Sequence, residues 1–328
     1  MRARLAAYKS GLLKTKRLNA PVISVGNLTT GGTGKTPLVA WVCRVLAREG
    51  RKVTILTRGY GRANAGQRVV ASDGVNVLTS TEQAGDEPQL LAENLKGIAS
   101  VICDSDRAAA GQWAIEKLGA DVLVLDDGYQ HLQLARDLNI AIIDATNPWG
   151  GGHQLPYGMM REPRNSLARA DCVVLTRNNE ESDPAVLKGE INRFTAAPIF
   201  TSRMQTSLVR RVDAVQPTKL TAIAQPVAAF CGIGNPSSFF DHLRREGFTL
   251  AHARAFPDHH RYQQGDIDHL CKAAKATGAS SLITTAKDAV KLRDFAFELP
   301  CYVLEIDVVI DQEETVIDLI RGAISRRV

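Results

Sequence analysis

The sequence predicts an α/β fold in which helices flank a parallel sheet, with a second, smaller α/β domain after it. Three observations support this prediction. Short β-branched runs alternate with helical stretches along the chain. A glycine-rich stretch near residue 30 lies between an apolar run and a helical one, and a later apolar run ends in two acids. In open α/β sheets, such loops and strand ends meet at one edge, where ligands bind.

The expected strands are short runs rich in Val, Ile and Leu. The first set covers residues 22–25, 53–57, 101–103, 122–125, 140–144, 173–176 and 199–201, and the second covers 227–231, 282–285 and 302–306. Residues 204–226 are polar and contain two prolines, so they are expected to be a connector with short strands. The predicted divisions are therefore a basic segment at 1–20, a first domain at 21–203, this connector, and a smaller domain at 227–328.

The stretch GNLTTGGTGKTP, residues 26–37, is similar to a phosphate-binding loop of the form G-x-x-x-x-G-K-[ST], except that Thr29 stands where the pattern begins with Gly. A predicted helix at 36–48 follows it. Backbone N–H groups at 31–36 would wrap a β-phosphate, the Lys35 ammonium would bridge β- and γ-oxygens, and the Thr36 hydroxyl would take one Mg²⁺ position. The alternative is a glycine-rich turn with a chance lysine. A dinucleotide-binding loop is excluded, because Lys35, Thr36 and Pro37 follow Gly34.

Composition places the chain among ordinary globular proteins. It has 328 residues, of which 45% are hydrophobic and 23% charged, enough for two domains. Its six cysteines are scattered without a C-x-x-C pair, so we expect reduced, packed thiols in the cytosol rather than zinc or disulfides. No run approaches 18 apolar residues and the first residues lack an apolar signal core, so neither a membrane span nor a secretory signal is expected.

The basic excess is concentrated at the start of the chain. Residues 1–20 hold six Arg and Lys and no acid, against a formal net charge of +5 for the whole chain, so the remainder is slightly acidic. Read as a helix, Leu5, Tyr8, Leu12 and Leu13 form an apolar stripe flanked by cations, which suits an anionic membrane surface. The alternative is a first helix that packs this stripe on the core. Nucleic acid is not an expected partner, since aromatic residues are sparse.

A second motif is VLVLDD at 122–127, an apolar run that ends in Asp126 and Asp127. A buried strand ending in acids beside a phosphate loop is typical of the Walker B arrangement, whose carboxylate holds Mg²⁺ directly or through water. One acid would serve the metal and the other would support it. The alternative is a turn or helix cap after the strand.

Several motifs together carry a family resemblance. The segments SVGNLTTGGTGKTP, LTRGYGR, AGDEPQLLA, VLDDGYQHLQLARDLNIAIID, LPYGMMREP, FPDHHRY and TTAKDAVKL occur in the order and spacing of the tetraacyldisaccharide 4'-kinases. The resemblance runs from about residue 20 to residue 295, and DDGYQH followed by LARD is its most specific part. The loop of that family resembles GNLTxGGxGKT, so Thr29 is ordinary within it. The resemblance implies a variant P-loop NTPase fold, with 21–203 as the kinase domain.

The resemblance also implies an activity and a location. The activity is ATP- and Mg²⁺-dependent phosphorylation of the 4'-hydroxyl of a tetraacylated glucosamine disaccharide 1-phosphate, which forms lipid IVA in lipid A biosynthesis. The location is the cytoplasmic face of the inner membrane of a Gram-negative bacterium, as a peripheral protein on the anionic surface. The expected ATP- and phosphate-binding residues are Thr29, Thr30, Gly31, Gly32, Thr33, Gly34, Lys35 and Thr36.

The attacking hydroxyl must lose a proton, which requires a carboxylate or an imidazole within reach. By resemblance this role belongs to a dyad of Asp86 and His259, with Asp258 to orient the imidazole; the sequence leaves His260 as an alternative to His259. Asp86 also fits an N-cap before a helix at 87–94. By resemblance Glu162 is an acid near the metal, and its alternative is a surface acid paired with Arg161 or Arg164.

Other positions give weaker signals. Arg58 and Tyr60 follow the second strand and would lie near a phosphorylated substrate, although a turn explains the glycines around them. Gln130 and His131 would contact substrate or nucleotide, or pack under the loop. The segment TAKDAVKL resembles a base-reading motif with Lys287 and Asp288, but capping by Thr285 and a face shared by Lys287 and Lys291 also explain it.

The chain departs from the family pattern in two places. Tyr157 and Met159 stand in LPYGMMRE, where relatives resemble LPAGPLRE, which changes the expected shape of that loop. Only about 20 residues precede the first strand, fewer than in many relatives, so a reduced membrane anchor is expected.

Two other functions fit part of the sequence. One is a membrane-associated switch ATPase with the deviant loop KGGVGKT, but the signature lysine of that loop is Thr30 here, and DDGYQH and FPDHH have no place in such a switch. The other is a kinase of a soluble small molecule, which would need no amphipathic acceptor.

Overall fold

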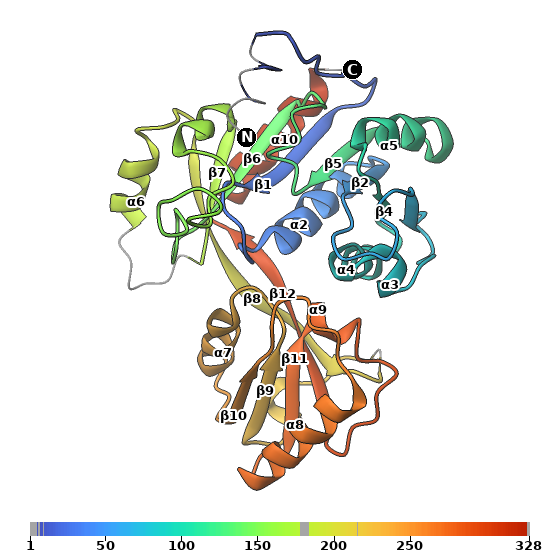
Figure 1. Cartoon of the computed structure of the whole chain (residues 1–328), viewed down its shortest axis with the longest axis vertical. Coiled ribbons are helices and arrows are strands. Elements are labelled where there is room, and N and C mark those ends of the chain that lie inside the picture. Colours follow the sequence, from blue (N-terminus) through green and yellow to red (C-terminus); the bar gives the residue numbers. More distant parts are fainter. Residues whose placement is uncertain (1–4, 6, 9, 178–183, 215, 327–328) are drawn as a thin grey trace. The chain divides into compact units, whose positions relative to one another are not determined.

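The computed structural model describes residues 5, 7–8, 10–177, 184–214 and 216–326 and forms two compact α/β units (Figure 1). The first unit comprises Met1–Met204 and Val308–Val328, and the second comprises Gln205–Asp307. The chain passes between the units only within two long strands, β8 (Ile199–Arg211) and β12 (Cys301–Ile310).

The sheet of the first unit is almost entirely parallel. Its strands lie in the order β8-β7-β6-β1-β5-β2-β4-β3, and only β3 runs antiparallel to its neighbour. This order puts β1, which leads into the glycine-rich loop, between β5 and β6. The other strands are β1 (Val22–Asn27), β2 (Val53–Thr57), β3 (Val69–Ser72), β4 (Ala99–Cys103), β5 (Val122–Asp126), β6 (Leu138–Asp144) and β7 (Cys172–Thr176).

Helices cover both faces of this sheet. Alternate residues of a strand point to opposite faces, so Val122 and Val124 of β5 join a core with α2, α4 and α10, while Leu123 and Leu125 join a second core with α5. Strands buried on both sides read as continuous apolar runs. The helices of the unit are α2 (Lys35–Arg48), α3 (Thr81–Ala84), α4 (Asp86–Asn94), α5 (Arg107–Trp113), which continues into a π-helical turn (Ala114–Leu118), a 3₁₀ helix (Arg164–Arg169), α6 (Pro184–Ile191) and α10 (Glu313–Ser325).

The second unit has a parallel sheet of its own, in the order β10-β9-β11-β12. Ala228 and Phe230 of β9 pack in a core with α8, and Val227 and Ala229 pack in a core with α7. Its other elements are β9 (Val227–Cys231), β10 (Leu250–Ala255), β11 (Ser281–Thr285), α7 (Pro236–Arg245), α8 (Gln264–Ala276), α9 (Ala286–Ala289) and a 3₁₀ helix (Leu220–Ala222).

The α/β fold with a parallel sheet is confirmed, and all ten predicted strands are present. Nine lie within a few residues of their expected bounds, whereas the strand expected at 199–201 continues to Arg211 as β8. β3 and β10 were not predicted. The compact units also differ from the predicted domains at 21–203 and 227–328, because α10 packs Val316 and Ile320 into the core of the first unit. The predicted connector at 204–226 contains the end of β8 and the second 3₁₀ helix.

The helical prediction for the basic segment is wrong beyond its first turns. Leu5 and Tyr8 are helical, but Gly11 adopts a left-handed φ of 75° and Leu12 and Leu13 follow in a bend. Glycine in this conformation commonly ends a helix. Leu12 and Leu13 are exposed and do not pack on the core. Over the described part of the chain, no helix has the length and apolar character to cross a bilayer. All six cysteines are free and buried, as predicted.

Candidate active site

The glycine-rich loop joins the end of β1 to the start of α2, as predicted. Gly34 precedes α2 in a left-handed conformation with φ of 81°, and a Cβ there would lie 2.8 Å from Met204 Cε. Glycine is therefore required at the turn into the helix. Because α2 is 14 residues long, the free amides and the dipole at its N-terminus favour an anionic group on the loop.

Side chains at the end of β7 orient the peptide groups of the loop. The Thr176 hydroxyl donates to Thr33 O at 2.9 Å, and the Arg177 guanidinium donates to Gly32 O. In a planar trans peptide, the carbonyl and the following N–H point in opposite directions. The amides of Thr33 and Gly34 therefore face away from β7, where they are available to a phosphate.

The near end of the loop pairs with the segment that holds Met159 and Met160. Thr30 N donates to Met159 O at 2.7 Å, and Thr29 forms a strand-like bridge with Met160. An extended, paired backbone has no need of glycine, which explains Thr29 in this loop. The Thr30 N–H is used in this pairing, so it is not among the amides available to a phosphate. The available amides begin at Gly31.

Lys35 points its ammonium toward the end of β5. Its Nζ lies 3.3 Å from Asn27 Oδ1 and 3.6 Å from Asp127 Oδ1, and only 12% of its side chain is exposed. Asn27 also donates to Thr33 Oγ1 at 2.9 Å, so one buried amide holds both the lysine and the loop. The loop cation is thereby fixed between the phosphate loop and the acid pair.

Asp126 is a buried carboxylate with little compensation. The Thr57 hydroxyl donates to its Oδ2 at 2.9 Å from the neighbouring strand β2. Burial, followed by the negative charges of Glu87 and Asp127, raises the pKa of Asp126 to about 6. A carboxylate with excess negative charge around it is a favourable place for a cation.

Asp127 is in the opposite situation. It adopts a left-handed φ of 50°, and Arg161 Nη1 donates to its Oδ2 at 2.6 Å. Burial alone would raise its pKa, but Lys35 and Arg161 hold the pKa of Asp127 below its usual value. The two acids thus differ in their surroundings: Asp127 is paired to cations, whereas Asp126 accepts a hydrogen bond from Thr57 and is buried near other negative charges.

Glu162 is not the surface acid that the alternative interpretation expected. Its side chain is fully buried, and both carboxylate oxygens accept from Arg169 Nη2, at 3.0 and 2.8 Å. Arg161 and Arg164, the partners named in that alternative, pair with Asp127 and Glu190 instead. This ion pair occupies the oxygens with which Glu162 would bind a metal.

Asp86 is the first residue of α4 and not its N-cap, so the capping interpretation is wrong. The N-cap is Gly85, with φ of 94°, where a Cβ would lie 2.5 Å from Tyr60 O. Only glycine fits at this close approach. Glu87, the next residue of α4, is near enough to Asp126 to raise its pKa. The start of α4 is therefore close to the acid pair.

The predicted substrate residues divide into exposed and packed ones. Arg58 and Tyr60 are exposed after β2. Gln130 Nε2 donates to Asn27 O at 2.9 Å, at the start of the phosphate loop, and His131 is buried, with its backbone N–H donating to Gly128 O at 2.9 Å.

In the second unit, His259 and His260 have different surroundings. The His260 ring stacks on Phe256 at 4.6 Å and its Nε2 lies 3.0 Å from Asp266 Oδ2. His259 has a left-handed φ of 60°, and its Nε2 lies 3.4 Å from Lys287 Nζ. His260 is thus committed to packing, which favours His259 as the functional imidazole.

Asp258 and Asp288 also have distinct roles. Asp258 Oδ1 accepts from His259 N at 3.1 Å and from Lys287 Nζ at 3.2 Å, so it fixes the backbone at the histidine. Asp288 is fully buried and accepts from Tyr262, Gly232 N and Thr285, which caps α9 as predicted. These internal bonds leave Asp288 no role in reading a base. The expected Lys287–Lys291 helix face is absent from the described structure, because α9 ends at Ala289.

Residues 1–325 of the chain match the family described as tetraacyldisaccharide-1-P 4'-kinase. The chain belongs to this family. It is 45% identical to the tetraacyldisaccharide 4'-kinase of Geobacter metallireducens over 293 residues, 89% of this chain and 84% of the relative. It is 43% identical to that of Geobacter sulfurreducens over 309 residues, 94% and 85% of the two chains. The ATP complex of LpxK from Aquifex aeolicus superposes with a TM-score of 0.79 at 32% identity, covering 98% of this chain and 94% of that one.

Several residues around the phosphate loop of this 4'-kinase family member were not singled out from the sequence. They are Asn27, Thr57, Glu87, Arg107, Asp144, Arg161, Arg169, Thr176 and Arg177. Most of them reach the site from a distant part of the chain, so no local pattern predicts them. Asn27 and Glu87 stand inside motifs but received no role, and Arg161 was named only as a possible partner of Glu162. Arg107 is buried, and burial lowers the pKa of its guanidinium. The nearby charges of Asp127 and Asp126 act in the opposite direction and raise it.

Thr176→Val is expected to raise the KM for ATP about tenfold, because the Thr33 carbonyl loses its donor and the loop amides lose their fixed direction. A buried carbonyl without a partner costs about 1–3 kcal/mol. Thr176→Ser keeps the hydroxyl and should behave like the parent. Equal KM values for the Val and Ser variants would show that this hydroxyl does not orient the loop.

Asp126→Asn is expected to stabilise the protein at pH 7.5, by about 5 °C in Tm, while lowering turnover. Folding raises the pKa of Asp126 from 3.8 to about 6, because the folded protein disfavours the charged carboxylate. The protonated acid therefore adds stability below pH 3.8, and this contribution is lost as the pH rises through about 6. Asparagine carries no charge and retains an acceptor for Thr57. The gain in Tm should disappear near pH 4. The exposed carboxyl variant Asp318→Asn provides the control, and a pH-independent difference in Tm would argue against a raised pKa.

Proposed function

We propose that the first unit of this ATP-dependent tetraacyldisaccharide 4'-kinase binds the ATP phosphates on the loop between β1 and α2 and transfers the γ-phosphoryl group to the 4'-hydroxyl of its lipid A precursor. The observation that carries the proposal is the convergence of Lys35, at the start of α2, and Asp127, directly after β5, 3.6 Å apart. Phosphoryl transfer requires mainly charge neutralisation and positioning. Lys35 and the loop amides supply both.

The acid pair suits a magnesium ion held with the phosphates. Mg²⁺ in such sites takes one or two protein carboxylates and completes its shell with phosphate oxygens and water. Asp126 would hold it with the Thr36 hydroxyl, since burial and the neighbouring charges of Glu87 and Asp127 raise the pKa of Asp126, and a cation there would offset both effects. When bound, the ion neutralises charge on the transferred phosphoryl group. Asp127 keeps Lys35 and Arg161 in place at its side.

We assign the general base to Asp86, assisted by His259, on the resemblance of GDEP and DHH to the family motifs. Asp86 lies at the start of α4 in the first unit. The next residue, Glu87, is near enough to Asp126 for its charge to raise the pKa of that acid, so the start of α4 is close to the acid pair. His259 lies in the second unit, where Asp258 and Lys287 fix its position. A carboxylate and an imidazole are both suited to accept the proton of an attacking hydroxyl.

The test is transfer of labelled γ-phosphate from ATP to purified tetraacyldisaccharide 1-phosphate in detergent. The expected product is the 1,4'-bisphosphate, formed only with both substrates present. The same disaccharide without acyl chains serves as the soluble comparison. ATP hydrolysis without transfer would overturn the kinase assignment, and equal turnover of the soluble sugar would favour a kinase of soluble small molecules.

We further propose that the segment 1–20 contacts the anionic cytoplasmic face of the inner membrane. Leu12 and Leu13 are exposed beside the cluster of basic residues. Cations near such a surface contribute about 1 kcal/mol each. Changing Arg2, Arg4 and Lys14 to Gln is therefore expected to weaken binding to anionic vesicles and reduce its salt sensitivity, with Tm unchanged. Unaltered vesicle binding would contradict membrane contact by this segment.

A further inference from the structure

One loop next to the phosphate site presents three large apolar side chains to solvent. Leu155 is 55% exposed, Tyr157 90% and Met159 40%. Single exposed apolar residues are common on protein surfaces, but three within five residues of one loop, two of them lining one cavity, indicate a binding surface. The loop lies in the first unit between β6 and β7.

The backbone of this loop is held by hydrogen bonds within the loop itself. Leu155 N donates to Met160 O at 2.9 Å, Met160 N donates to His153 O at 3.0 Å, and Tyr157 N donates to Gln154 O at 3.0 Å. These bonds close the loop on itself. The apolar side chains are therefore held outward by an ordered scaffold, which lowers the entropic cost of binding a ligand to them.

The other edge of the same loop belongs to the phosphate site. Met159 O accepts from Thr30 N, and Met159 Cε lies so close to Gly31 that a Cβ there would be 3.2 Å away. Two residues further on, Arg161 donates to Asp127. The same short segment therefore carries the exposed apolar side chains and contacts the phosphate loop. A ligand bound to those side chains would lie next to the phosphate loop.

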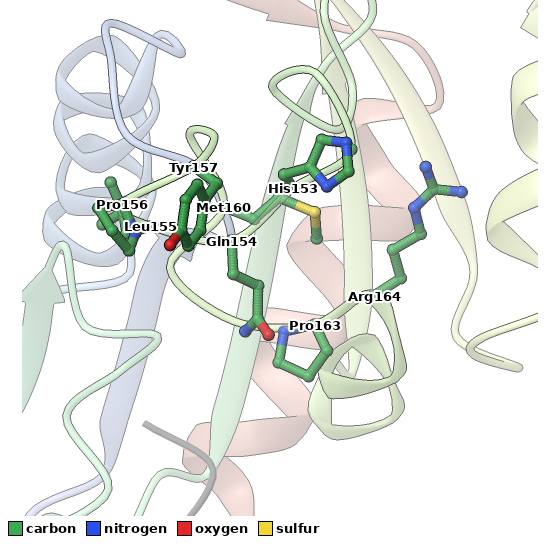
Figure 2. A pocket seen from close by; sticks show the side chains of 9 residues that line it. His153, Gln154, Leu155, Pro156, Tyr157, Met160, Pro163 and Arg164 are labelled. Carbon is green, nitrogen blue, oxygen red and sulfur yellow. The ribbon is translucent and has the colours of Figure 1, made fainter.

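A cavity of about 510 Å³ lies along the loop, within the range of small-ligand sites. Figure 2 shows Leu155, Pro156 and Tyr157 on one side of it and the Arg164 guanidinium on the other, with Gln154 between them. Arg164 is held over the Trp149 ring at 4.7 Å and paired with Glu190 at 2.8 Å. The cavity combines an apolar wall with fixed polar groups.

We propose that this cavity and the apolar loop bind a fatty acyl chain of the acceptor glycolipid, with Gln154 and Arg164 facing the ester or amide group that joins the chain to the sugar. The inference rests on the proposed function, because the acceptor must place its hydroxyl at the phosphate loop. An acyl chain is apolar, like the wall of the cavity, and its ester or amide linkage can accept hydrogen bonds from Gln154 and Arg164. Because the same loop also contacts the phosphate loop, a bound acceptor would have its sugar near the phosphates.

The test uses the double variant Leu155→Ser, Tyr157→Ser, with Leu78→Ser as the control, since Leu78 is similarly exposed at 53% and precedes α3. KM values for the tetraacyl acceptor and for ATP are measured in mixed micelles at fixed detergent. Loss of binding that is equal in ground and transition states raises KM and leaves kcat unchanged. We expect the acceptor KM to rise about tenfold, or about 1.4 kcal/mol, with kcat, the KM for ATP and Tm unchanged.

Each other outcome is decisive. An acceptor KM equal to that of the Leu78→Ser control would overturn the proposal. Weaker binding of the double variant to substrate-free vesicles, in proportion to the change in KM, would assign the loop to the bilayer and also overturn it. Absence of glycolipid phosphorylation by the unsubstituted protein would refute the proposed function itself, which separates the two failures.

Discussion

Lys35→Ala is expected to lower turnover by about a hundredfold or more with the fold intact. The ammonium is the cation that the loop itself contributes to the phosphates, and removing one such preorganised group typically costs about 10²–10³ in kcat. The change also removes one of the cations near Asp127, which include Arg161 and Arg107 as well. The measurement is steady-state phosphate transfer to the lipid acceptor, with Tm recorded in parallel.

The matched control is Arg48→Ala, an exposed cation in the last turn of the same helix. Its turnover should equal that of the parent. If Lys35→Ala retained parental turnover, the loop would not be the phosphate site. A large fall in its Tm would mean that Lys35 acts through the fold rather than through ATP.

Asp86→Asn is expected to abolish most turnover while Tm changes by no more than a few degrees and ATP still binds. Asp86 is the first residue of α4, so the change weakens its interaction with the helix dipole by about 0.3–1 kcal/mol. It also removes the basicity of the group that we propose as the general base. Glu93→Gln, in the last turn of the same helix, controls for loss of a carboxylate.

His259→Ala should lose somewhat less turnover than Asp86→Asn, and the double variant should be little worse than Asp86→Asn alone. Residues that act as one unit give strongly non-additive losses. If the two losses simply multiplied, the residues would act independently. If Asp86→Asn retained near-normal turnover, Asp126 and Asp127 would be the next candidates for the base.

The buried strands could be predicted because a parallel sheet covered on both faces requires continuous apolar runs. β3 and β10 escaped prediction for the opposite reason. β3 is a four-residue antiparallel edge strand, and β10 reads LAHARA, with its last three side chains exposed. Edge strands lack one set of neighbours, so their sequences carry little of the pattern that marks a central strand.

The candidate site was predicted only as far as local motifs extend. The glycine-rich loop, Lys35 and the acids after β5 follow directly from the order of residues along the chain. The partners that give these groups their properties come from elsewhere: Thr176 lies 143 positions after Thr33, and Arg161 lies 34 after Asp127. Glu162 shows the limit clearly, because its partner Arg169 is near in sequence but belongs to no motif.

The division of the chain has a consequence for its synthesis. The second unit, Gln205–Asp307, is inserted into the first, and α10, which is synthesised after the inserted unit, supplies buried residues to the core that α2 also joins. Trp41 Nε1 donates to Glu313 Oε1 at 3.0 Å across this core. Domains generally fold as units during translation, so the phosphate loop, although made early, must wait for the inserted unit and α10 before its domain is complete.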